Sequence, residues 1–280
     1  MRGQSTCPEM PRLDATQAYT NAHFIPDAEG YIDHWAEMAQ SFREREAALG
    51  RARLNHPYGD APRQKIDMFH PSGPAKGLVV FVHGGYWLRF DRGYWSHSAA
   101  GALARDWAVA MPSYTLAPEA RIADITREVA RAIDVAAGFV RGPLVLTGHS
   151  AGGHLVARMG CKDVALAADL RARIAHILPI SPVSDLRPLR DTAMNEGLKL
   201  GESEAVAESP VCHPRPDIPV TVWVGAEERP VFLDQARWLA EAWGAPLRAA
   251  PGRHHFDVID DLEDPDAPLM RALLDGIETA

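Results

Sequence analysis

The sequence predicts an α/β fold with a mostly parallel central sheet and helices on both faces of that sheet. Three observations support this prediction. From residue 63 onward, short apolar segments alternate with longer amphipathic segments, which is the order of parallel-sheet folds. The segment Leu78-Val79-Val80-Phe81-Val82 is apolar throughout, as strands are when helices cover both faces. The chain has 280 residues, 46% of them hydrophobic, which is enough to bury a sizeable core.

The elements follow in chain order. Residues 27–48 are expected to form an amphipathic helix that Asp27 caps, because apolar side chains recur there at helical spacing: Ile32, Trp35, Met38, Ala39 and Phe42. We therefore expect residues 1–62 to form an N-terminal helical extension. Strands are predicted at 64–70, 78–82, 107–112, 143–147, 174–180, 220–224 and 247–250. Helices are predicted at 93–105, 121–139, 151–161, 230–243 and 266–279.

The 22 glycines and 22 prolines are scattered between these elements, and no repeat or polar linker divides the chain. One domain over residues 1–280 is the simplest organisation. Residues 181–218 are the exception to the alternating pattern, because they are rich in Ser, Pro, Asp and Arg and only weakly periodic. An insertion over the active site is the interpretation we favour for them.

Composition excludes several classes of protein. The chain has 29 Lys and Arg against 37 Asp and Glu, a net charge of −8, which opposes nucleic acid and anionic lipid. The longest apolar runs are about five residues, far short of a membrane span of roughly 18. Residues 1–14 lack the apolar core of a signal peptide, and Cys7, Cys161 and Cys212 are isolated. We expect a cytoplasmic protein that acts on a small-molecule substrate and has no nucleic-acid or membrane partner. The sequence leaves open whether two copies form a homodimer.

The strongest chemical signal is Gly148-His149-Ser150-Ala151-Gly152, directly after a predicted strand and directly before a predicted helix. This is the G-x-S-x-G nucleophile elbow in the context that it requires. Glycines at both flanking positions leave room for the sharp turn that exposes the serine, and the helix N-terminus favours negative charge developing beside it. Ser150 is therefore the predicted nucleophile. The alternative is that this segment is a structural turn with no catalytic role.

A second glycine-rich segment, His83-Gly84-Gly85-Tyr86-Trp87, follows the strand at 78–82. In this architecture the loop after that early strand lies beside the elbow and supplies N–H groups to an oxyanion. We assign the oxyanion donors to the N–H groups of Gly85, Tyr86 and Ala151. A hairpin turn is the structural alternative for the glycine pair.

A serine needs a histidine base and an acid to orient it, and in this architecture both follow the serine in the chain. His255, in the sequence His254-His255-Phe256-Asp257, is the predicted base. Glu227 and Glu228 both follow the strand at 220–224, and either could orient the imidazole. Glu228 is preferred and Glu227 is the alternative.

Metal and nucleotide chemistry have little support in the sequence. His149, His154 and His176 lie in no H-E-x-x-H or Cys/His spacing, and neither a P-loop lysine nor a G-x-G-x-x-G helix start is present. We expect no metal and no cofactor.

These residues resemble the α/β-hydrolase superfamily and, within it, the arylformamidase (kynurenine formamidase) group and its esterase relatives. His83-Gly84-Gly85-Tyr86-Trp87 is similar to the H-G-G-x-W motif of that group. Further similar stretches extend the resemblance from about Tyr19 to the C-terminal helix: 113–119, 181–189, 224–228 and 255–258. The resemblance implies an oxyanion hole at Gly85 and Tyr86. It also matches Glu228 to a family acid that is usually an aspartate.

For the substrate, the resemblance implies hydrolysis of an aryl formamide of the N-formylkynurenine type through an acyl-enzyme, with a short-chain carboxylesterase as the alternative. Aromatic residues near the oxyanion loop could hold such a ring, and Trp87 and Tyr114 are the predicted substrate contacts, with packing as the alternative. Arg89 and Arg92 on the same loop could pair with an anionic group. A non-catalytic binding protein on this scaffold is the hypothesis from another class.

Overall fold

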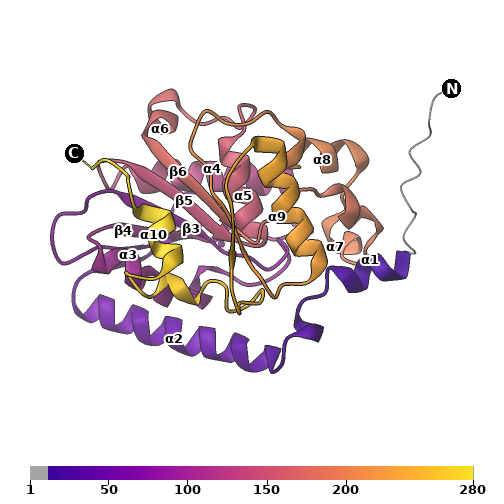
Figure 1. Cartoon of the computed structure of the whole chain (residues 1–280). Helices are drawn as coiled ribbons and strands as arrows, with labels where there is room; N and C mark the ends of the chain where they lie inside the picture. The colour runs from indigo at the N-terminus through magenta and orange to yellow at the C-terminus, as the bar shows by residue number, and fades with distance from the viewer. Residues whose placement is uncertain (1–11, 280) are drawn as a thin grey trace.

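The computed structural model describes residues 12–279, and within them eight strands form a single sheet (Figure 1). The order across the sheet is β1-β2-β4-β3-β5-β6-β7-β8. The bounds are β1 Ala52–Pro57, β2 Lys65–Phe69, β3 Leu78–Val82, β4 Ala108–Pro112, β5 Leu144–His149, β6 Ile174–Ile180, β7 Val222–Gly225 and β8 Leu247–Ala250. The first 11 residues of the predicted extension, Cys7 among them, lie outside the described residues.

The sheet is mostly parallel, as predicted. The pairs from β4 through β3, β5, β6 and β7 to β8 are all parallel, whereas β1 pairs with β2 and β2 with β4 in antiparallel fashion. β1 was not predicted from the sequence. It is an edge strand in which half-buried and exposed residues alternate, so it carries no apolar run. The helical part of the N-terminal extension therefore ends at Ala48 and does not reach residue 62.

Helices cover both faces of the sheet, and the alternation of side chains along β3 shows why its sequence is apolar throughout. Leu78, Val80 and Val82 belong to one core, with α4 (Ile122–Ala137), α5 (Ala151–Gly160) and α9 (Pro230–Trp243). Val79 and Phe81 belong to the other core, with α2 (Ala28–Ala48), α3 (Ala100–Ala104) and α10 (Pro268–Leu274). In Figure 1, α2 lies along one side of the sheet.

Two predicted helical features differ in the structure. Asp27 precedes α2 in a left-handed conformation with φ of 53° and makes no side-chain capping bond, so its predicted capping role is wrong. The helix predicted at 93–105 is broken into η2 (Arg92–Tyr94), η3 (Ser96–Ala99) and the short α3. The break lies at Trp95, whose φ of −129° is not helical and whose indole is buried in the core beneath α2.

Residues 181–218 form short helices: η4 Arg187–Asp191, α7 Asn195–Leu198, α8 Glu202–Ala207 and η5 Pro210–Cys212. The N-terminal α1 (Arg12–Ala18) lies beside this segment, and the Ala193 N–H donates to the Thr16 hydroxyl over 2.9 Å (Figure 1). Further short helices are η1 (Ala22–Phe24), α6 (Ala168–Arg173) and η6 (Asp260–Leu262). Among the described residues, no helix is both long enough and apolar enough to cross a bilayer.

Candidate active site

Ser150 occupies the turn between β5 and α5 in a conformation that few non-glycine residues adopt, with φ of 56° and ψ of −114°. The turn depends on its two glycines. A Cβ on Gly152 would lie 1.9 Å from the Val82 carbonyl oxygen, and one on Gly148 would lie 2.6 Å from the Gly152 carbonyl oxygen. The Ser150 N–H donates to the Ile180 carbonyl over 2.9 Å, which ties the turn to the neighbouring strand β6.

His255 and Glu228 meet in a buried hydrogen bond of 2.6 Å between the imidazole Nδ1 and the carboxylate Oε2. The other carboxylate oxygen of Glu228 accepts from the Gly225 N–H over 2.9 Å and from the Ser181 hydroxyl. These contacts hold the carboxylate in one orientation. The Glu227 side chain, by contrast, is exposed. The geometry therefore favours Glu228 over the alternative that the sequence left open.

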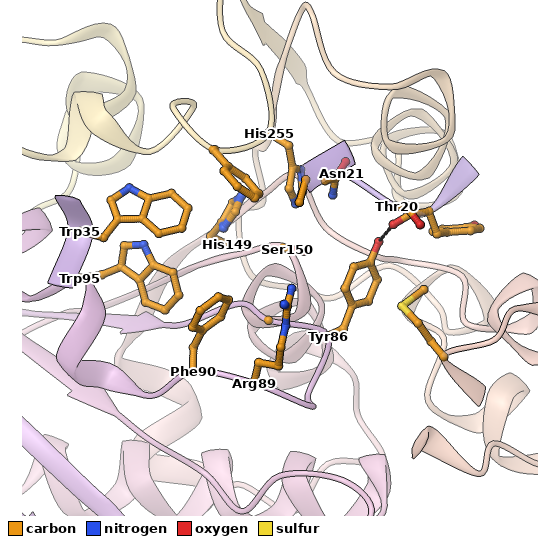
Figure 2. A pocket seen from close by; sticks show the side chains of 15 residues that line it. Thr20, Asn21, Trp35, Tyr86, Arg89, Phe90, Trp95, His149, Ser150 and His255 are labelled. Carbon is orange, nitrogen blue, oxygen red and sulfur yellow. Dashed lines mark hydrogen bonds between the residues drawn. The ribbon is translucent and has the colours of Figure 1, made fainter. Parts of the chain in front are cut away.

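Ser150 and His255 line the same pocket, which has a cavity volume of about 210 Å³. Figure 2 places Ser150 near the centre of this pocket with the His255 ring above it, and among the described side chains no hydrogen bond joins the two. Contacts of this kind are often loose in a free enzyme and tighten around substrate. The arrangement brings a hydroxyl, an imidazole and a carboxylate from three distant loops to one place.

The loop after β3 lies against the serine turn. A Cβ on Gly84 would lie 2.9 Å from the His149 carbonyl oxygen, so the approach requires glycine there. Gly85, Tyr86 and Trp87 have φ values of 104°, 53° and 58°, a left-handed run closed by the Leu88 N–H donating to the Gly85 carbonyl over 3.0 Å. Within the described chain, no protein group accepts a hydrogen bond from the N–H groups of Gly85, Tyr86 or Ala151. Unpartnered N–H groups of this kind suit an oxyanion.

Two neighbouring histidines are buried in neutral form. Burial lowers the pKa of His83 to about 4, and its ring stacks on Tyr114 with 4.3 Å between ring centroids. Burial, and after it the nearby His255, lower the pKa of His149 well below its ordinary value. His149 lies 4.6 Å from the His255 ring, centroid to centroid. A neutral His149 adds no positive charge beside the His255 ring.

The pocket has two different sides (Figure 2). One is aromatic: Trp35, Phe90 and Trp95 lie together in Figure 2, and Phe256 packs on Trp35 with 5.1 Å between ring centroids. The other is formed by the N-terminal segment Tyr19–Ala22 together with Tyr86 and Met194. Ser150 lies between the two sides in the view of Figure 2. A planar group on one side and a small acyl group at the serine would fit this division.

Comparison with known proteins identifies the fold family. A model of the alpha/beta hydrolase fold matches residues 79–244, which is more than half of the chain. The chain belongs to the α/β hydrolase fold family. The matched range includes Ser150 and Glu228. His255 lies outside it, and so do the pocket residues Tyr19–Ala22, which we call the N-terminal wall.

Several relatives of this hydrolase can be named. A kynurenine formamidase of Danio rerio is 28% identical over 277 residues, covering 91% of this chain and 93% of the relative. One of Salmo salar is 28% identical, covering 82% of this chain and 84% of the relative. A crystal structure from Silicibacter sp. TM1040, with a provisional thioesterase designation, is 51% identical, covers 93% of this chain and 98% of its own, and has a TM-score of 0.90. Over most of its length, the chain is thus an arylformamidase-like α/β hydrolase.

The structure places Trp87 and Tyr114 away from the pocket of this hydrolase, which corrects their predicted role as substrate contacts. Both side chains are fully buried, and neither lines the pocket. Trp87 packs edge-on against His154 at 5.0 Å, and the Tyr114 hydroxyl donates to the His83 carbonyl over 3.0 Å. The left-handed backbone at residues 85–87 accompanies this inward placement of the indole, so both residues support the loop from below.

The N-terminal wall was missed by local sequence reasoning. Tyr19, Thr20, Asn21 and Ala22 line the pocket although they lie about 130 residues before Ser150 in the sequence. The Tyr86 hydroxyl donates to the Tyr19 carbonyl over 2.6 Å, which joins this wall to the loop after β3 (Figure 2). The one signal for these residues was that the family resemblance already begins near Tyr19.

A group that could ligate a metal lies at the far end of α5. Ligand atoms of Cys161, Asp163 and His213 lie within 4.8 Å of one another. The Arg158 guanidinium already binds the Asp163 carboxylate through bonds of 3.1 and 2.6 Å. Burial raises the pKa of the Cys161 thiol to about 11, so the thiol is protonated and a poor ligand. The Arg158 guanidinium therefore satisfies the Asp163 carboxylate, and the group is a poor candidate for a metal site.

Proposed function

We propose that this α/β hydrolase is a serine hydrolase that cleaves a small aryl formamide or related amide through an acyl-enzyme. The observation that carries the proposal is the 2.6 Å bond between His255 and the fully buried Glu228 carboxylate, in a pocket that also contains Ser150 at a strained turn. The similarity to kynurenine formamidases over most of the chain supports the choice of substrate class.

In the proposed reaction the Ser150 hydroxyl oxygen attacks the formyl carbon while His255 takes the hydroxyl proton. Glu228 accepts a hydrogen bond from Nδ1–H of His255, which leaves Nε2 to act as the base and stabilises the imidazolium. The N–H groups of Gly85, Tyr86 and Ala151 bind the negative oxygen of the tetrahedral intermediate.

The intermediate collapses when the carbon–nitrogen bond breaks and His255 returns its proton to the departing aryl amine. Water then attacks the formyl ester of Ser150, with His255 again taking a proton, and formate leaves as the serine recovers its hydroxyl. The aromatic side formed by Trp35, Phe90, Trp95 and Phe256 would hold the aryl amine.

A second candidate is a carboxylesterase or thioesterase for short acyl chains, which the thioesterase designation of the 51% identical relative favours. The two candidates share the chemistry at Ser150 and differ in the leaving group. An ester or thioester has a better leaving group, so an esterase needs less help from His255 in protonating it.

The test compares kcat/KM for N-formylkynurenine with kcat/KM for p-nitrophenyl acetate and for a short-chain acyl thioester. Ser150→Ala provides the background rate for each. The amidase proposal expects efficient formamide cleavage that this variant abolishes. Ester or thioester turnover faster by several orders of magnitude, with formamide cleavage at background, would establish the second candidate instead.

A further inference from the structure

The charge of the pocket differs from that of the protein around it. The chain carries a net charge of −8. The described residues that line the pocket nevertheless include no aspartate or glutamate, and Arg89 is the lysine or arginine among them. The Glu228 carboxylate, which contacts His255 behind the pocket, is fully buried and bonded to His255, Gly225 and Ser181. The open part of the pocket therefore attracts anions.

Arg89 has a position suited to binding a ligand. Its backbone N–H donates to the Gly85 carbonyl over 3.1 Å, which fixes Arg89 directly beside the left-handed loop. Its guanidinium carbon lies 5.1 Å from the centroid of the Phe90 ring, at the edge of the aromatic side of the pocket. Figure 2 shows the side chain rising between Phe90 and Tyr86 toward Ser150.

The other arginines near this loop are already engaged. Arg92 forms an ion pair of 2.9 Å with Asp67, and Arg229 donates to the Ala18 carbonyl over 2.9 Å and stacks on Phe24. Arg89 is exposed, and none of the described carboxylates lies within ion-pairing distance of it. Its five N–H donors are thus available to a substrate.

We propose that Arg89 is a specificity-determining residue that binds a carboxylate carried by the aromatic part of the substrate. The inference rests on the proposed function and deepens it, because it restricts the substrate to aryl acids. The aromatic side holds the ring, and the guanidinium at its edge pairs with the carboxylate while the acyl group lies at Ser150. A planar fork of donors matches a carboxylate better than any neutral group.

The test measures kcat/KM for 3- and 4-acetoxybenzoate. Each value is divided by kcat/KM for the acetoxybenzamide with the same ring substitution pattern. These pairs match in size and differ in charge. Arg89→Gln is expected to lower the ratio about ten-fold, the lower end for a charge-assisted hydrogen bond because the arginine is exposed. Arg53→Gln is the matched control, since Arg53 is also exposed and lies 4.7 Å from a phenylalanine ring, that of Phe139, outside the pocket.

Charge reversal gives a second arm. Arg89→Glu is expected to prefer 3-(trimethylammonio)phenyl acetate over the acetoxybenzoates, the reverse of the parent enzyme. A ratio that stays at the parental value in both Arg89 variants would overturn the proposal. It would also be overturned if the anion preference appeared only on the acyl side, with phenyl hemisuccinate favoured over phenyl butyrate and no preference among the acetoxybenzoates.

A binding measurement separates this proposal from the proposed function. Benzoate binding to Ser150→Ala can be followed through the fluorescence of Trp35 and Trp95, which line the pocket. Adding Arg89→Gln is expected to raise the benzoate Kd about ten-fold whether the natural reaction is at an amide or an ester. An unchanged Kd would contradict the role of Arg89. Slow formamide turnover with an intact ratio for the esters would contradict the amidase proposal alone.

Discussion

Two walls of the pocket come from different parts of the chain. The wall with Ser150 and the loop after β3 lies at the carboxyl ends of parallel strands, inside the range that matches the hydrolase family, 79–244. The N-terminal wall, Tyr19–Ala22, comes from a segment outside that range. Ser150, Glu228 and the loop after β3 thus lie in the part of the chain that matches the shared fold, whereas the N-terminal wall and His255 lie outside it. Part of the shape of the pocket therefore depends on a segment that the family match does not include.

The largest expected effect concerns the proposed base, His255. His255→Ala is expected to lower kcat/KM about 10⁴-fold or more, because Ser150 loses its base. His254→Ala is the matched control, since His254 is the adjacent histidine and bonds the Phe256 N–H over 3.1 Å instead of Glu228. Steady-state kinetics with p-nitrophenyl acetate measure both. Equal losses in the two variants would show that His255 has no special part in the reaction.

The acid gives the next largest effect. Glu228→Gln is expected to lower kcat at least about a hundred-fold, because the amide holds the imidazole less well and does not stabilise its positive charge. Glu227→Gln is expected to stay near the parental rate, since the Glu227 side chain is exposed. A loss confined to Glu227→Gln would reassign the acid.

The contact between the loop after β3 and the N-terminal wall gives a smaller effect. Tyr86→Phe removes the hydroxyl that donates to the Tyr19 carbonyl, and kcat/KM is expected to fall about ten-fold as the loop after β3 loosens. Tyr58→Phe is the control, because the Tyr58 hydroxyl donates to the Ser113 carbonyl over 2.7 Å away from the pocket. Each variant should lose about 1 kcal/mol of unfolding free energy. Equal activity in the two variants would mean that the N-terminal wall does not hold the loop.

The last expected effect is on stability against acid and not on turnover. Burial lowers the pKa of His83 in the folded protein to about 4 from the ordinary value of 6.5, so the unfolded chain binds more protons between these pH values. The free energy of unfolding should fall by on the order of 1 kcal/mol per pH unit as pH drops from 6.5 toward 4. The difference in unfolding free energy between pH 7 and pH 5, measured by urea unfolding, should be smaller for His83→Gln than for the parent. It should be unaltered for His23→Gln, since His23 is exposed.

Much of the fold could be predicted because its signals are local. The all-apolar residues of β3 and the glycines around Ser150 each reveal their structure within a few residues. The strand β1 could not be found in this way, because Ala52, Leu54 and His56 are only half buried at the sheet edge. The break at Trp95 was also hidden, since the packing of its indole beneath α2 overrides a helical pattern.

The candidate site was less predictable where it depends on distant contacts. Choosing between Glu227 and Glu228 requires knowing that Ser181 and the Gly225 N–H bind one of the two carboxylates. Trp87 belongs to the loop after β3, yet its side chain packs on His154 beneath that loop. The N-terminal wall reaches the pocket only through tertiary packing, so no local pattern in Tyr19–Ala22 reveals it.

The proposed reaction depends on Ser150 being a nucleophile that His255 activates. Labelling with a fluorophosphonate, followed by mass spectrometry of the digested protein, tests this most directly, because the probe phosphonylates activated serines. One adduct is expected on the peptide that contains Ser150, and it should be lost in both Ser150→Ala and His255→Ala. An adduct on another residue, or labelling of Ser150 that is undiminished without His255, would contradict it.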